Sequence, residues 1–152
     1  MIAPEPGSFE EIAADKVGAV YYDDQFETDT GHPVRFVILR GTASLCAYLG
    51  IPVPHPLANR DYDSLSLNCH GGLTYGADHL YGVSEPADGW YWYGWDYAHL
   101  GDKNFWDLQT VPPRFADSHG WTPAEVVADS VDTINNLIVL LRESENGPSD
   151  QT

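Results

Sequence analysis

The chain has 152 residues, of which 43% are hydrophobic, and this is enough to build one domain with a sizeable core. Seven basic residues face 23 acidic ones, which gives a formal net charge of -16. Such a surface argues against direct binding of nucleic-acid phosphates, which requires basic residues. No apolar run approaches the length of a membrane span, and the first residues lack the pattern of a secretory signal. We therefore expect a cytoplasmic protein with neither nucleic acid nor membrane as a direct partner.

The negative charge admits three explanations. It could keep the protein soluble, adapt it to a salt-rich environment, or mimic nucleic acid and so occupy a DNA-binding partner. A mimic needs carboxylates in rows along one face. Here the acids are scattered, with small clusters at Asp23, Asp24 and Asp61–Asp63. An acidic inhibitor of a host factor is therefore kept only as an alternative function.

The first half of the chain alternates apolar stretches with turn-forming residues, which is typical of strands and loops. The elements expected there are a short helix within Pro6–Ala14, a strand at Val20–Tyr22, a loop at Asp23–Gly31 and a strand at Val34–Arg40. Ser8 and Glu11 form the capping-box pattern that starts the helix. Thr42–Leu49 fits either a short helix or a strand. Three prolines in Ile51–Leu57 exclude a helix interior or a central strand, so we expect a loop or short edge segment there.

Two strands are expected in the middle of the chain. Leu65–Cys69 alternates apolar and polar residues, which predicts a half-buried strand that runs into the Gly71-Gly72 pair. Trp90–Trp95 is a second strand. Its alternation places Trp90, Trp92 and Asp96 on one face and Tyr91, Tyr93 and Trp95 on the other. Loops are expected at Gly76–Gly89 and at Lys103–Gly120, the second carrying Pro112 and Pro113.

A long helix closes the chain. Thr122, Pro123 and Glu125 form a strong helix start, and apolar residues then recur at helical spacing, which predicts a helix over about residues 123–143. We expect one α+β domain at residues 1–144: an antiparallel or mixed sheet of four to six strands, with this helix packed on it. Residues 145–152 are expected to form a flexible acidic tail.

The candidate chemistry lies at the ends of the two middle strands. His70 stands at the end of one, and Asp96, His99 and Asp102 stand at the end of the other. If the strands are adjacent, these four residues meet. They could then run general acid–base catalysis, or His70, His99 and Asp102 could hold a divalent metal ion, which makes a metal-dependent hydrolase one hypothesis. The spacing is no established metal motif, and the alternative is that both histidines make structural hydrogen bonds that fix the two turns.

Residues around these groups could bind a ligand. Gly71 and Gly72 permit positive φ or a close backbone approach, and Thr74 and Tyr75 could donate hydrogen bonds. Aromatic residues near the site could form a stacking surface for a base or sugar, and we expect Trp92 and Trp95 to be among them. Packing in the core is the more common role of such residues. The two cysteines, Cys46 and Cys69, show no pattern of a disulfide framework or a catalytic nucleophile.

At these residues the chain resembles an uncharacterised family of small proteins from phage genomes, prophages and some bacteria. The resemblance lies in His70–Tyr75 and in Trp92–Asp102, and it extends over about residues 45–141. Tyr97 stands where the family pattern has a cysteine, and Cys69 where it has a small aliphatic residue. The resemblance implies a phage-related origin and no established activity.

Together these features favour a phage-type accessory protein that binds, and could hydrolyse, a small polar ligand such as a nucleotide at the His/Asp site. The alternative is a protein without turnover that sequesters a ligand or a host protein.

Overall fold

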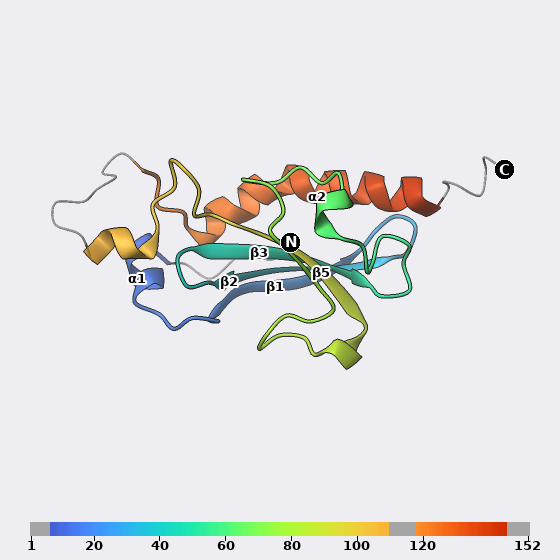
Figure 1. The fold of residues 1–152 in the computed structure, drawn as a ribbon, viewed down its shortest axis with the longest axis horizontal. Coiled ribbons are helices and arrows are strands. Elements are labelled where there is room, and N and C mark those ends of the chain that lie inside the picture. The colour runs from blue at the N-terminus through green and yellow to red at the C-terminus, as the bar shows by residue number, and fades with distance from the viewer. Residues whose placement is uncertain (1–6, 110–117, 146–152) are drawn as a thin grey trace.

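Five antiparallel strands form one sheet in the order β1-β2-β3-β5-β4. The computed structural model describes residues 7–109 and 118–145. The strands are β1 (Val20–Glu27), β2 (Pro33–Arg40), β3 (Leu45–Pro52), β4 (Tyr75–Ala77) and β5 (Trp90–Asp96). Figure 1 shows this sheet under the long helix α2 (Pro123–Glu145), so the α+β architecture expected from the sequence is confirmed.

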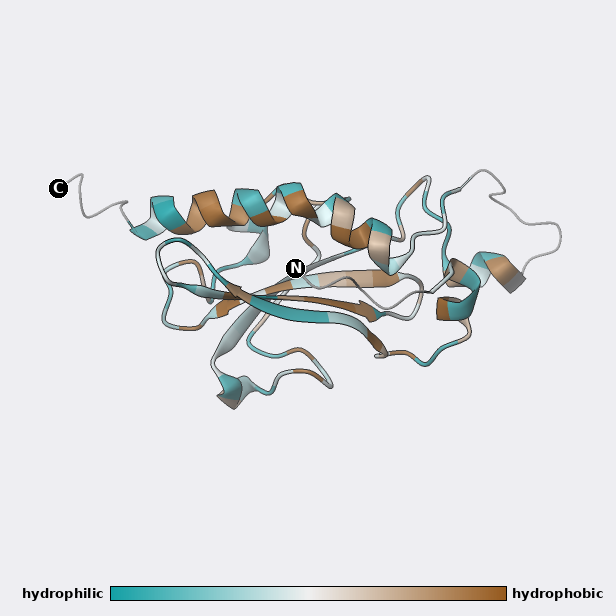
Figure 2. Cartoon of the chain, turned by 180° about the vertical axis from the view of Figure 1, so that it is seen from behind, coloured by the Kyte–Doolittle hydropathy of each residue, from teal (hydrophilic) through white to brown (hydrophobic). Residues whose placement is uncertain are grey.

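The helix α2 covers one face of the sheet with an apolar stripe. Val126, Ile134, Leu137 and Leu141 are buried, and Figure 2 shows hydrophobic and hydrophilic turns alternating along the helix. The predicted cap is present, because the Thr122 N–H donates to Glu125 Oε1 at 3.0 Å and the Glu125 N–H donates to Thr122 Oγ1 at 3.4 Å. Among the described residues, no helix is long and apolar enough to cross a membrane.

Each face of the sheet has its own hydrophobic cluster. Tyr93, Trp95 and Tyr97 pack in the cluster that includes the buried face of α2. On the other face Trp92 packs with a second group of buried residues, which are Val37, Leu39 and Leu80. The predicted alternation of β5 is therefore confirmed. Side chains pack on both faces of β5, so the residues that directly follow this strand start from a fixed point in the structure.

Two predictions for the first half of the chain need correction. Asp23–Glu27 is not a loop but the second part of β1, which pairs only with β2 and so can expose acidic side chains at the sheet edge. β3 is a central strand that extends to Pro52, in a segment for which such a strand was excluded. The pairing of β3 with β2 ends at Gly50. Pro52, which has no N–H to donate, therefore has no hydrogen bond to make on the β2 side.

The predicted strand at Leu65–Cys69 is also wrong. This segment stays outside the sheet, and its Asn68 N–H donates to Asn136 Oδ1 of α2 at 2.8 Å. β5 pairs instead with β4, which begins at Tyr75. The Asn136 side chain in the middle of α2 takes the place of the strand partner that the alternating pattern implied.

The remaining elements are short. They are α1 (Phe9–Ala13) and three 3-10 turns at Tyr62–Ser64, Pro86–Asp88 and Phe105–Gln109. Ser8 caps α1 as predicted, because its Oγ accepts the Glu11 N–H at 3.1 Å. The flexible tail was predicted to begin at Glu145, but this residue is still helical because α2 extends to it. The predictions for Pro112 and Pro113 and for residues 146–152 lie outside the described residues.

Candidate functional site

The turn that contains His70 and the turn after β5 meet near the beginning of α2. His70 Nε2 lies 2.7 Å from Asp102 Oδ2. The same carboxylate accepts the His99 backbone N–H at 3.0 Å and the Trp121 indole N–H at 2.8 Å. We call His70, His99, Asp102 and Trp121 the Asp102 cluster. The sequence prediction that the two histidines and Asp102 come together agrees with this geometry, although His70 does not end a strand.

Asp102 is an ionised acceptor in this cluster. Its side chain is only 6% exposed, and burial alone would raise its pKa. The hydrogen bonds from His70, from the His99 backbone and from Trp121 outweigh that effect, so the pKa of Asp102 lies below its ordinary value. Because this carboxylate accepts from His70 Nε2, neutral His70 carries its proton on Nε2 and leaves the lone pair on Nδ1.

Aromatic rings hold the His70 imidazole in place. It stacks on Tyr97, with ring centroids 4.5 Å apart and planes 17° from parallel, and it meets Trp121 edge-on at 5.1 Å. The Tyr97 hydroxyl in turn donates to Asp129 Oδ2 of α2 at 2.8 Å and accepts the Trp95 indole N–H at 3.1 Å. The sequence analysis missed Tyr97 and Trp121. The available signals were the place of Tyr97 within Trp92–Asp102 and the place of Trp121 directly before the helix cap.

Asp96 and His99 form a second, looser pair. Asp96 Oδ1 lies 3.2 Å from His99 Nε2, but this nitrogen is buried and lacks the geometry of a hydrogen bond. Asp96 is otherwise held by the Ala98 backbone N–H at 3.1 Å and by the Thr74 hydroxyl at 3.3 Å. The side chains of Asp96 and His99 are 30% and 34% exposed. Solvent or a ligand can therefore reach the Asp96 carboxylate and the exposed part of the His99 ring, but not the buried His99 Nε2.

Gly71 gives His99 its position. Its φ is +70°, and a Cβ at this residue would lie 2.1 Å from His99 Nε2, so a side chain here would displace the imidazole. Gly72 also has a positive φ of +86°, but a Cβ there would meet no atom within 4 Å. Both glycines thus allow the backbone to turn with positive φ. Gly71 alone also leaves room for the His99 ring to lie against the backbone.

Two cavities flank His99. One, of about 380 Å³, is lined by Thr42, Ala43, Ser44, Cys46, Asp96, Ala98 and His99. The other, of about 260 Å³, is lined by Ala98, His99, Leu100, Gly101, Asp102, Asn104 and Ser118. Burial, and secondarily the charge of Asp96, raises the pKa of the Cys46 thiol to about 11, so the first cavity contains a thiol and no thiolate nucleophile at neutral pH.

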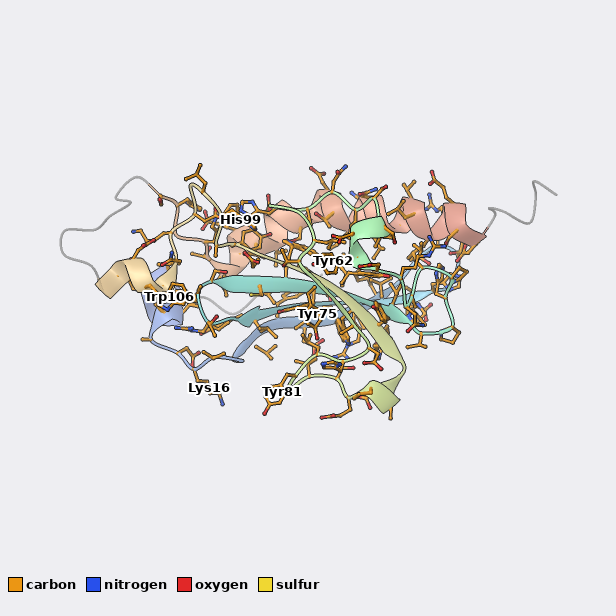
Figure 3. All side chains as sticks on the ribbon, viewed as in Figure 1. Lys16, Tyr62, Tyr75, Tyr81, His99 and Trp106 are labelled. Atoms are coloured by element: carbon orange, nitrogen blue, oxygen red, sulfur yellow. The ribbon has the colours of Figure 1, made fainter. Side chains whose placement is uncertain are left out.

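The aromatic residues predicted to contact a ligand are placed differently from the histidines. Trp92 and Trp95 are 0% and 1% exposed and belong to the two separate hydrophobic clusters, so neither ring offers a stacking surface. Tyr75 donates its hydroxyl to the His79 carbonyl at 2.7 Å and stands against Tyr48, away from His99. In Figure 3 His99 lies beside α2, whereas Tyr81 lies in the loop below the sheet. Of the predicted ligand-binding side chains, Thr74 alone touches the Asp96–His99 pair.

A metal ion shared by His70, His99 and Asp102 would compete with existing bonds. Both Asp102 oxygens already accept hydrogen bonds, and His70 turns a proton-bearing nitrogen toward this carboxylate. Within the described residues, the side chains close enough to share one ion are instead His32, His55 and Glu145. The geometry of the Asp102 cluster favours a positioned histidine over a metal ligand set.

Comparison with models of known families finds no match to the chain, and searches of curated proteins and of solved structures likewise find none. The interpretation of the site therefore rests on its geometry.

Proposed function

We propose that this protein binds a small polar molecule, neutral or cationic, in the cavity beside Asp96 and His99. The observation that carries the proposal is the Asp96–His99 pair itself. A part-exposed imidazole and a part-exposed carboxylate border a cavity of about 380 Å³, which is within the usual size range of ligand pockets. Thr42 and Ser44 also line this cavity, but the buried Ser44 hydroxyl already donates to the Leu45 carbonyl and accepts the Tyr97 N–H.

The charge of the site narrows the ligand class. Within residues 7–109 and 118–145, no lysine or arginine lines either cavity, and the chain as a whole carries a net charge of -16. A phosphate group would meet the Asp96 carboxylate without a compensating cation. A nucleoside, a sugar or an amine fits this lining better than the nucleotide that the sequence alone suggested.

The same arrangement carries the groups for acid–base chemistry. Asp102 fixes the tautomer of His70, as a carboxylate does for a catalytic histidine, and leaves Nδ1 free of the proton. Hydrolysis of a bound ligand would use His99, paired with Asp96, as the proton-transfer group that lines the cavity. His70 lines neither cavity, so it would serve as the base only for a ligand that extends past the His99 ring, whose centroid lies 5.8 Å from that of His70. Binding without turnover is the alternative, and it requires the Asp96–His99 pair but not His70.

A ligand screen by NMR chemical-shift changes tests this proposal. The panel consists of amines, sugars and nucleosides, each nucleoside being matched with its monophosphate. We expect saturable binding of a neutral or cationic member, lost in Asp96→Asn and in His99→Ala. His119→Ala is the control, because His119 forms a comparable but exposed pair with Glu125 at 2.7 Å. Binding that survives Asp96→Asn and His99→Ala, or a uniform preference for the monophosphates, would contradict the proposal.

The biological setting is proposed separately. The resemblance of His70–Tyr75 and Trp92–Asp102 to a phage-associated family supports an accessory role in a phage or prophage. In that setting a ligand-binding protein would act in the host cytoplasm, on a host metabolite or against a host protein.

A further inference from the structure

A second group of histidines and a carboxylate lies at the other end of α2. His32 comes from the turn between β1 and β2, His55 from the turn after β3, and Glu145 from the last turn of α2. His32 Nε2 contacts Glu145 Oε1, and His55 Nε2 lies 3.4 Å from the same oxygen. We call these three residues the Glu145 cluster. No pattern in the sequence connected these three residues.

The polar atoms of this cluster converge without satisfying one another. The His55 side chain is 2% exposed, yet its Nε2 has no hydrogen-bond partner within the described residues, and neither has Glu145 Oε1. A buried polar atom without a partner costs free energy, so such a pair of atoms calls for an explanation. The three candidate ligand atoms all lie within 4.8 Å of one another, which is close enough for one ion to bind them together.

The donor set indicates the class of ion. Two imidazole nitrogens and one carboxylate oxygen suit zinc and the neighbouring divalent transition metals, whereas calcium and magnesium prefer oxygen ligands alone. Glu145 brings the one formal negative charge of the set. The His32 side chain is 35% exposed, which leaves the cluster open to solvent for ion entry and for water ligands.

We propose that His32, His55 and Glu145 form a site for one divalent transition-metal ion that fastens the end of α2 to two turns of the sheet. The site is separate from the Asp102 cluster and does not depend on the function proposed for it.

One hydrogen bond makes this site distinctive. His55 Nδ1 accepts the Leu57 backbone N–H at 3.1 Å, so the metal-free neutral ring carries its proton on Nε2. An ion at Nε2 moves that proton to Nδ1, where it would oppose the Leu57 N–H. Metal binding must therefore turn the Leu57 amide away from the ring. This switch of tautomer weakens the site relative to one without such a bond, and it provides a spectroscopic signature.

The experiment titrates Zn²⁺ into chelator-treated full-length protein without a histidine tag, followed by calorimetry and by nitrogen-15 NMR. We expect one ion per chain, a change of the His55 tautomer and a shift of the Leu57 amide signal. His32→Ala and Glu145→Gln should each weaken binding by at least about tenfold. These two variants avoid the buried His55, whose replacement could disturb the fold.

Two controls separate this site from other histidines. His79→Ala, which removes an exposed histidine 3.1 Å from Asp78, should leave Zn²⁺ affinity unchanged, and so should His70→Ala. The proposal is overturned if the wild-type chain binds no Zn²⁺ at micromolar concentration, or if His32→Ala and Glu145→Gln bind it as tightly as the wild type. If His70→Ala loses Zn²⁺ binding, the ion belongs to the Asp102 cluster instead. If Zn²⁺ binds without shifting the Leu57 amide signal, His55 is not one of its ligands.

Discussion

The two ends of α2 hold histidine–carboxylate clusters that differ in how far their hydrogen bonds are satisfied. The helix has 23 residues and is therefore roughly 35 Å long, so the clusters are independent of each other. Asp102 accepts three hydrogen bonds through its two oxygens, whereas Glu145 Oε1, although His32 Nε2 contacts it, and His55 Nε2 have no hydrogen bond within the part of the chain that the structure describes. A satisfied carboxylate fixes the groups around it. An unsatisfied one has capacity left for a proton or an ion.

The largest effect is expected from Asp102→Asn. The amide turns at least one donor toward the existing donors and leaves buried N–H groups of His70, His99 or Trp121 without an acceptor. We expect a loss of about 2 to 4 kcal/mol in the free energy of unfolding, measured with urea. Asp78→Asn is the control, because Asp78 pairs with His79 in an exposed loop and its side chain is 51% exposed. If both variants lose equally little, the Asp102 cluster does not stabilise its two turns.

The next largest effect is a difference in the free energy of unfolding between substitutions at Gly71 and at Gly72. Both Gly71→Ala and Gly72→Ala place a side chain at positive φ, which costs about 1 to 2 kcal/mol. Gly71→Ala adds the collision with His99, so we expect its loss in the free energy of unfolding to exceed that of Gly72→Ala by about 1 kcal/mol or more. The His99 ring signals should move in Gly71→Ala and stay in Gly72→Ala. Equal stabilities and unmoved His99 signals would show that the close approach to Gly71 does not position the ring.

The difference between the clusters also decides what could be predicted from sequence. His70, Asp96, His99 and Asp102 stand within 33 residues, at the edges of recognisable turn and strand patterns, and this local pattern was enough to group them. His32, His55 and Glu145 come from distant segments with no shared motif, and only the packing of α2 across the sheet brings them together. No periodicity or spacing in one sequence records such a contact.

The errors in the fold have the same origin. The acidic half of β1 was predicted as a loop because propensity takes no account of a paired edge strand whose one side faces water. Leu65–Cys69 has the alternation of a strand, but α2 supplies its partner through Asn136. By contrast, both helices were placed correctly because their capping residues act locally, as Ser8 and Thr122 do.

Acid should distinguish the clusters by the pH at which each loses stability. Burial lowers the pKa of His55 below its ordinary 6.5, with smaller effects from Glu145, which opposes the shift, and from His32 and Arg60, which add to it. The unfolded ring therefore binds a proton at higher pH than the folded ring, and the contribution of His55 is lost as pH falls below about 6.5. The pKa of Asp102 is lowered from 3.8, so its contribution is present above that value and is lost only as pH falls below it.

The pH at which each cluster loses stability is found by measuring the free energy of unfolding against pH. The proteins compared are the wild type, His55→Asn and Asp102→Asn. His55→Asn removes the titrating ring, while its amide oxygen can still accept the Leu57 N–H. Between about pH 7 and pH 5 we expect the wild type to lose stability relative to His55→Asn but not relative to Asp102→Asn. A wild type and His55→Asn that run parallel across this range would show that His55 gains no proton on unfolding.

The smallest effect is expected from Arg142→Ala, which tests what holds the end of α2. Arg142 makes two hydrogen bonds to the Asp29 carboxylate, at 3.2 and 2.6 Å, one helix turn before Glu145. The two side chains are 47% and 61% exposed, so water screens the pair, and we expect a loss of about 0.5 kcal/mol in the free energy of unfolding that shrinks further in high salt. Zn²⁺ affinity should remain within about twofold of the wild type, since Arg142 offers no ligand atom. A loss above about 2 kcal/mol would mean that this exposed pair, and not the Glu145 cluster, anchors the helix end. The contrast between the two ends of α2 would then lie in their exposure to solvent and not in the unsatisfied polar atoms of His55 and Glu145.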